Sequence, residues 1–283
     1  MNDKQSLISL INERLESGDV ELPVFDDIAL RIHREVRENK LDADEMCKIL
    51  EEDPVLVSEL LRMANSSFFA GLSPVSNLRE AAVRLGVKQI ASIVFSVSQK
   101  RMYSASNGPF KERLTRLWLH SSAVSIGARW LAKNAGYRNL ADEAFVVGLL
   151  HDVGKLSLLC IIEDLILNEN MNLTDEIVDI TLRQLYCDHG ARLLEMWNLP
   201  DSFKQVVLHQ DDDTFDDSNV ILCMVRLVNQ ACILENIDDM PGQEASNLES
   251  LPETQALGLS EIDLAELRLV LEDVRGDKQA AAA

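Results

Sequence analysis

The stretch VVGLLHDVGKLSLL, residues 146–159, sets a histidine beside an aspartate in an otherwise apolar run. Burying two such polar side chains is costly unless each finds a partner. Imidazole and carboxylate groups are also common ligands of divalent metal ions. His151 and Asp152 therefore predict either a buried metal site or a buried network of hydrogen bonds.

Four of the five histidines fall between residues 120 and 209. Helical spacing places His120, His151 and His189 each on an apolar face, and the case for His209 is weaker. Imidazole and carboxylate groups that project from facing helices are the way in which helical bundles hold metal ions. A lone buried histidine more often bonds a carbonyl, so a core network without an ion stays the alternative. The remaining histidine, His33, lies in the charged segment LRIHREVRENK and is expected to face water.

Short capped helices are indicated in the first hundred residues. The segment LDADEMCKILEE begins with a capping box of Asp42 and Glu45. In DPVLVSELLRMANSS, Asp53 precedes a proline at the first helical position. NLREAAVRLG starts at Asn77 and stops at Gly86. The next segment, VKQIASIVFSVSQ, suits a helix by its spacing, and its β-branched content leaves a strand open.

Longer helices are expected after a break at SASNGPF, residues 104–110. They span about 111–135, 141–166, 174–197, 201–210 and 218–235, and a last helix begins in SEIDLAELRLVLEDV. The sequence thus predicts an all-α fold in three parts. These are an amino-terminal helical lobe (1–105), a helical bundle (106–235), and a polar, mobile connection with a carboxy-terminal helix (236–283). The lobe is expected to pack on the bundle, because only a short stretch separates them.

The charge of the chain bears on its partners. It has 27 Lys and Arg against 47 Asp and Glu, a net charge of −20, which predicts no binding to nucleic acid or to anionic membranes. The amino terminus lacks the pattern of a signal peptide, and no apolar run approaches the ~20 residues of a membrane helix. The five cysteines are scattered, without a Cys-x-x-Cys pair, and are expected to be reduced. These features together predict a cytoplasmic protein.

The order of His120 and then His151-Asp152, within LLHDVGK, resembles the HD-domain superfamily of metal-dependent phosphohydrolases. Three earlier segments are similar to the HDOD family, the HD-related output domain of bacterial signalling proteins. They are LPVF (22–25), EEDPVLVSELLRMANSSFF (51–69) and AAVRLGVKQI (81–90). The resemblance covers roughly residues 15–235, and it implies an HD-like helical bundle carrying the amino-terminal lobe.

The resemblance also implies a set of site residues. The implied metal ligands are His120, His151, Asp152, His189 and His209. Lys155 corresponds to the lysine of the HD-x-GK motif and is an implied phosphate contact. The closing aspartate of the HD pattern falls in MVRLVNQA, where this chain has Asn229. Gln210 stands where the HD-GYP branch carries a second histidine, and no Gly-Tyr-Pro segment follows.

These departures limit the metal content that we expect. Two divalent ions would bring four positive charges to one carboxylate and neutral imidazoles, so a dinuclear centre should be weak. One ion held by His120, His151 and Asp152 is the expectation. Because imidazole dominates the site, the ion should be iron, nickel, zinc or manganese and not calcium.

Three functions are open at this point. We favour a regulatory module of bacterial signal transduction with a degenerate HD-type metal site, whose partner is a signalling protein or a phosphorylated small ligand. The alternative is a metal-dependent phosphohydrolase or phosphodiesterase acting on a nucleotide-like substrate, with Asp152 and Lys155 as catalytic residues. A purely structural role is the third. The sequence shows no phosphate-binding loop of the P-loop or Rossmann type, which disfavours kinases and dehydrogenases.

Overall fold

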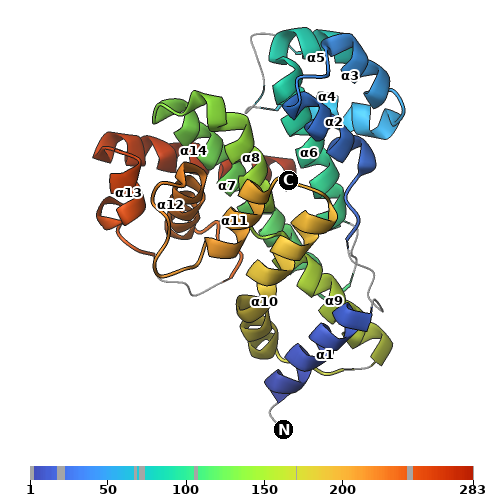
Figure 1. Ribbon diagram of the computed structural model, residues 1–283, viewed down its shortest axis with the longest axis vertical. Helices are drawn as coiled ribbons and strands as arrows, with labels where there is room; N and C mark the ends of the chain where they lie inside the picture. Colours follow the sequence, from blue (N-terminus) through green and yellow to red (C-terminus); the bar gives the residue numbers. More distant parts are fainter. Residues whose placement is uncertain are drawn as a thin grey trace. The chain divides into compact units, whose positions relative to one another are not determined.

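The computed structural model describes residues 3–17, 23–66, 69, 74–104, 108–169, 171–240 and 245–282. All regular structure in these ranges is helical, so the predicted all-α fold is confirmed. The helices (Figure 1) are α1 (Asp3–Ser17), α2 (Asp27–Arg37), α3 (Ala43–Leu50), α4 (Pro54–Ala64), α5 (Leu78–Leu85), α6 (Val87–Ser104), α7 (Lys111–Asn134), η1 (Arg138–Leu140), α8 (Ala141–Leu150), α9 (Val153–Glu169), α10 (Asp175–Met196), α11 (Asp201–His209), α12 (Val220–Leu234), η2 (Leu248–Ser250), α13 (Pro252–Ala256) and α14 (Glu261–Ala282).

The chain forms two compact units. One comprises Met1–Pro23 and Tyr103–Arg275, and the other comprises Val24–Met102 and Gly276–Ala283. Helix α1 therefore belongs with the later helices and not with a lobe of residues 1–105, because it packs against α10. The expected boundary at 105–106 lies outside the described residues.

The unit of residues 24–102 follows the capping signals of its sequence. Asp42 and Glu45 form the expected capping box at the start of α3. The Asp53 side chain accepts hydrogen bonds from the first-turn N–H groups of α4. Gly86, with φ of +80°, ends α5 in a conformation that favours glycine, and α6 begins at the next residue. The segment VKQIASIVFSVSQ is therefore helical, and the strand alternative is excluded.

His33 of α2 does not face water as expected. Its ring lies 5.4 Å from that of Phe95, centroid to centroid. Burial, together with the nearby Arg37, lowers the pKa of His33 to about 4. The expectation failed because packing against the buried Phe95 ring leaves His33 only partly exposed.

The expected single helix over 141–166 is two helices, α8 and α9, with His151 and Asp152 in the turn between them. The backbone carbonyls of both turn residues accept hydrogen bonds. The His151 carbonyl accepts a hydrogen bond from Gln210 Nε2 at 2.6 Å. The chain re-enters a helix where the Lys155 N–H donates to the Asp152 carbonyl at 2.9 Å. Because the helix is interrupted here, the side chains of His151 and Asp152 point in directions that a continuous helix would not allow.

Glycines allow the helices around this turn to approach closely. A Cβ on Gly148 of α8 would lie 2.7 Å from Ser125 Cα of α7. A Cβ on Gly154 of α9 would overlap the Tyr186 carbonyl oxygen of α10. The backbone of α7 thus lies against α8, and that of α10 lies against α9. Helix α7 carries His120 to the turn.

Two expectations about the rest of this unit need correction. Residues 138–169 have the length and apolarity of a membrane span, but 94% of the tested window is buried within the protein, as in a core helix. The expected mobile connection at 236–258 contains η2 and α13 and buries Leu248 and Leu257, while its residues 241–244 lie outside the described part. An ion pair of 2.6 Å between Arg226 and Glu253 ties it to α12. All five cysteines are free, as predicted.

Candidate metal site

The structure brings together three of the residues that the sequence singled out. His120 comes from α7, and His151 and Asp152 come from the turn between α8 and α9. The Nε2 atoms of the two histidines lie 3.2 Å apart, and Asp152 Oδ2 lies 3.4 Å from His120 Nε2 and 3.3 Å from His151 Nε2. Each residue is at most 1% exposed. The three atoms form a nearly equilateral triangle inside the protein.

The hydrogen bonds of the two imidazoles determine which ring nitrogen carries the proton and which one faces the triangle as a lone pair. His120 Nδ1 lies 3.0 Å from the Ile237 carbonyl oxygen, and His151 Nδ1 lies 2.8 Å from the Gly148 carbonyl oxygen. A carbonyl oxygen only accepts, so both Nδ1 atoms carry the proton in the neutral rings. The two Nε2 lone pairs and the Asp152 carboxylate then converge on one point, and Lys155 Nζ donates to the carboxylate oxygen of this set. A shared cation, either a proton or a metal ion, would offset the repulsion between the two Nε2 lone pairs, which lie 3.2 Å apart.

The spacing of the three acceptors fits a transition-metal ion. Two ligands at about 2.1 Å from an ion, and about 105° apart, lie about 3.3 Å from each other. The three measured separations of 3.2 to 3.4 Å match this geometry. Among the described histidine, cysteine and acidic residues, these three form the group whose ligand atoms lie close enough to share an ion. Asp152 Oδ1 and Gln210 Oε1 are also buried without a hydrogen-bond partner.

A lysine and a second carboxylate complete the cluster. Lys155 Nζ donates to Asp152 Oδ2 at 2.8 Å and reaches the Asp239 carboxylate at 3.1 Å. Its ammonium also lies 4.8 Å from the centroid of the Tyr186 ring, and the Tyr186 hydroxyl donates to Asp211. Asp152 was expected to be the only carboxylate of the site, and this expectation is wrong. Asp239, in the segment after α12, is the second.

The charges of the cluster support one another. Burial by itself would raise the pKa of Asp152, but His151 and Lys155 hold it well below its usual range. Burial would likewise lower the pKa of Lys155, and Asp152 and Asp239 raise it instead. The pKa of His120 is lowered, because burial outweighs the attraction of the same two carboxylates. Asp152 is therefore held as a carboxylate and Lys155 as an ammonium at neutral pH.

The structure does not bring the other predicted ligands into this cluster. His189 is buried on α10, where burial, assisted by Arg192, lowers its pKa to about 4. His209 ends α11 with its side chain 47% exposed, and it bonds Asp212 at 2.7 Å instead of pointing inward. Asn229 is partly exposed on α12, and the carboxylate that reaches the site is Asp239, ten positions later. The role of His189 and His209 as ligands stays a prediction.

Sequence reasoning missed Asp239 and Tyr186. Asp239 stands in ENIDDMPG, a polar segment interpreted as a mobile connection, although its adjacent acidic residues directly follow the last bundle helix. Tyr186 lies three residues before His189 on the same helix, and that spacing was a usable signal. The local sequence around Asp239 or Tyr186 does not by itself predict a contact with Lys155.

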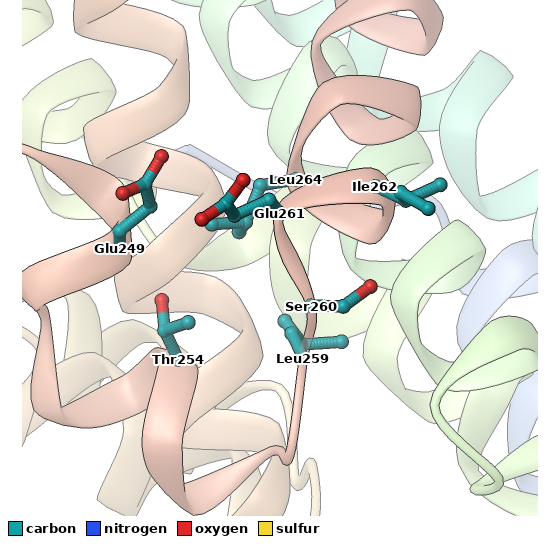
Figure 2. Close-up of a pocket in the computed structure, with 7 residues that line it drawn as sticks. All are labelled: Glu249, Thr254, Leu259, Ser260, Glu261, Ile262 and Leu264. Atoms are coloured by element: carbon teal, nitrogen blue, oxygen red, sulfur yellow. The ribbon is translucent and has the colours of Figure 1, made fainter.

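A cavity of about 560 Å³ lies elsewhere in the same unit, beside η2, α13 and α14. Figure 2 shows residues that line it, among them the carboxylates Glu249 and Glu261 and the hydroxyl residues Thr254 and Ser260. It contains none of the residues predicted to bind a metal. The chemistry-bearing residues are therefore concentrated in the buried cluster and not in this open hollow.

Comparisons with known proteins agree with the sequence pattern. The family model of the HDOD domain matches residues 22–213. An uncharacterized protein of Treponema pallidum (strain Nichols) is 22% identical over 187 residues, which cover 64% of this chain. The same match covers only 36% of the Treponema protein, so the chain spans about a third of that relative.

Solved structures share the fold. An HDOD domain protein of unknown function from Geobacter sulfurreducens has a TM-score of 0.77 at 24% identity, covering 96% of this chain and 97% of its own. A Shewanella amazonensis SB2B protein, provisionally named a metal-dependent phosphohydrolase, has a TM-score of 0.75 at 20% identity, with coverage of 97% and 99%. A Marinobacter aquaeolei VT8 protein, provisionally named a signal transduction protein, has a TM-score of 0.68 at 21% identity, with coverage of 99% and 64%. At these identities the likeness establishes the fold alone.

Proposed function

The chain belongs to the HDOD domain family, and from this premise we propose that it is a regulatory module of bacterial signal transduction. In this proposal the His-His-Asp cluster is an ion-binding element inherited from metal-dependent phosphohydrolases, and it does not hydrolyse a substrate. The domain would act by binding a signalling protein or a phosphorylated small ligand, and ligand binding would shift the balance between its conformations.

The burial of the site is the observation that carries this proposal. His120, His151 and Asp152 are each at most 1% exposed, and the Lys155 side chain is 7% exposed. A phosphodiester must place its phosphorus next to an activated water, and no part of the three ligand side chains is open to a substrate of that size. Lys155, the implied phosphate contact, is already bound to two carboxylates. Its ammonium is therefore already paired with carboxylates of the protein.

The residues present would hold one divalent ion through His120 Nε2, His151 Nε2 and Asp152 Oδ2. A bound transition-metal ion supplies Lewis acidity, which lowers the pKa of a bound water or polarises a phosphoryl oxygen. The carbonyls of Ile237 and Gly148 orient the two imidazoles for this task. This geometry is the observation that keeps the second function, a metal-dependent phosphohydrolase, as the alternative.

Hydrolysis assays separate the two functions. The metal-supplemented full chain should be given bis(p-nitrophenyl) phosphate and cyclic dinucleotides in the presence of Mn²⁺ or Fe²⁺. We expect no metal-dependent turnover in the wild type, in Asp152→Ala or in the control Asp44→Ala, which alters an exposed carboxylate. Turnover near ~1 per second, lost in Asp152→Ala and kept in Asp44→Ala, would be an ordinary enzyme rate and would overturn the regulatory proposal.

A further inference from the structure

The segment after α12 is attached to the His-His-Asp cluster at two points. The Ile237 carbonyl oxygen accepts a hydrogen bond from His120 Nδ1 at 3.0 Å, and Asp239 binds Lys155 Nζ at 3.1 Å. Ile237 and Met240 are buried, which seats the segment in the core. The Ile237 N–H also donates to the Cys232 carbonyl at 2.8 Å, at the end of α12. Residues 237–240, which we call the closing segment, are therefore bonded to the two sides of the cluster.

Lys155 is bonded to the oxygen that completes the triangle of acceptors. Asp152 Oδ2 lies 3.3 and 3.4 Å from the two imidazole Nε2 atoms and 2.8 Å from Lys155 Nζ. A divalent ion placed between the imidazoles and this oxygen would share it with an ammonium group. Both are cations, so each reduces the hold of Asp152 on the other. In a buried site this repulsion is weakly screened and therefore large.

We propose that Lys155, held between Asp152 and Asp239, is a built-in cation that competes with a divalent ion for Asp152. The inference rests on the proposed function only in taking the cluster to be an ion-binding element. It assigns Lys155 to a role opposed to the phosphate contact that the sequence implied. It also assigns Asp239, and not position 229, as the carboxylate that balances the charge.

The positions of the charges give the direction of each effect. The Lys155 Nζ atom lies 2.8 Å from the Asp152 oxygen that an ion would use, so its positive charge repels the ion. The Asp239 carboxylate lies 3.1 Å from the same Nζ atom and offsets part of this repulsion. Loss of Lys155 should therefore tighten ion binding, and loss of Asp239 should weaken it.

Co²⁺ is a suitable probe, because its visible absorption changes when imidazole and carboxylate replace water as ligands. The full chain, stripped of metal with a chelator, should be titrated with Co²⁺ and followed both by absorption and by calorimetry. The variants are Lys155→Met, the charge-preserving Lys155→Arg, Asp239→Asn and Asn229→Asp. Lys204→Met is the matched control, since it removes one positive charge from the surface of α11.

Lys155→Met should bind Co²⁺ at least about tenfold more tightly than the wild type, a difference of about 1.4 kcal/mol. Lys155→Arg, Asn229→Asp and Lys204→Met should each stay within about threefold of the wild type, and Asp239→Asn should bind several-fold more weakly. If Lys155→Met does not fold, as circular dichroism will show, Asp239→Asn carries the test. Equal or weaker binding by a folded Lys155→Met, or unchanged binding by Asp239→Asn, would overturn the competition.

The result is independent of the hydrolysis assay. Metal-dependent turnover by the wild type would end the regulatory proposal and leave the competition between Lys155 and the ion intact. Conversely, a chain with no turnover and with Co²⁺ affinity unaffected by Lys155→Met would retain the regulatory proposal and end the competition. Absence of Co²⁺ binding in both the wild type and Lys155→Met would also end it.

Discussion

At the residue scale, two backbone carbonyls orient the two imidazoles of the cluster. The Ile237 and Gly148 carbonyl oxygens accept hydrogen bonds from Nδ1 of His120 and of His151, so both Nε2 atoms face Asp152. The acceptors are thus oriented before any ion arrives, which spares an ion the cost of arranging them. The Lys155 ammonium, 2.8 Å from Asp152 Oδ2, places a positive charge beside these acceptors.

His33 gives the first prediction, because it titrates outside the cluster. Its pKa is about 4 in the folded chain, where burial disfavours the charged ring, and 6.5 is the ordinary value. Below pH 6.5 the unfolded chain therefore takes up a proton that the folded chain does not, so stability present above pH 6.5 is lost as the pH falls toward 4. A shift of this size corresponds to at most about 3 kcal/mol.

His33→Gln should accordingly reduce the fall in melting temperature between pH 7 and pH 5. Thermal unfolding of the wild type and the variant at both pH values makes the test. The account of His33 is wrong if its variant loses as much stability on acidification as the wild type.

The sequence predicts the residues of the cluster better than their surroundings. The inward faces of His120 and His151 follow from helical periodicity, because that signal is local. Asp239 could not be found in this way, since its contact with Lys155 spans 84 positions and depends on where the chain turns after α12. The partial burial of His33 could not be predicted for a related reason, because it depends on Phe95, which lies on another helix.

At the element scale, the turn between α8 and α9 matters most. Periodicity continues across residues 141–166 without a break, so the sequence predicts one helix where there are two. The break depends on a tertiary contact, the hydrogen bond from Gln210 to the His151 carbonyl, which local sequence does not encode. The caps of α3, α4 and α5 were predicted correctly because a cap is decided within four residues.

The crossing of α9 and α10 supports the turn from one side and can be tested by a single methyl group. Gly154→Ala would drive a Cβ into the backbone of α10, which cannot yield as a flexible side chain would. We expect a loss of about 2–4 kcal/mol in the free energy of unfolding, measured in urea. Gly276→Ala, at a helical glycine with no atom within 4 Å of the place that the added methyl group would take, should be neutral or stabilise by up to about 1 kcal/mol. A Gly154→Ala protein as stable as the control would contradict the close crossing.

Two helix caps differ in what else they bind. Asp42 caps α3 at an exposed position, while Asp53 caps α4 and also accepts from Arg101 at 2.9 Å. Asp42→Ala should cost about 1 kcal/mol, and Asp53→Ala should cost about 2 kcal/mol. Urea unfolding at neutral pH gives both values. Equal losses would mean that the ion pair with Arg101 adds nothing to the cap.

At the scale of the whole molecule, charge sets the clearest expectation. A net charge of −20 repels the phosphate backbone of nucleic acids. We expect no binding of a labelled random duplex at physiological salt, measured by fluorescence anisotropy. Sub-micromolar binding that weakens steeply as salt is raised would contradict this, because it would require a basic surface large enough to outweigh the total charge.

The division of the chain into units was only partly predictable. A short capped helix such as α1 carries no sign of the helix it will pack on, and its assignment to residues 103–275 depends on α10. The segment after α12 has the polar composition of a linker, although it contributes Asp239 to the cluster and Leu248 to the core. Composition reports how polar a segment is, and it does not report whether a few of its side chains are bound elsewhere.

The metal content of the saturated protein tests the central claim most directly, namely that the cluster is a single-ion remnant and not a two-ion hydrolytic centre. Wild type, Lys155→Met and Asp152→Ala should be equilibrated with excess Mn²⁺, freed of unbound metal by gel filtration, and analysed for ions per chain. We predict no more than one ion in the wild type, about one in Lys155→Met, and none in Asp152→Ala. Two ions per wild-type chain, both lost in Asp152→Ala, would contradict the account, because two ions at one site form the arrangement that cleaves phosphodiesters.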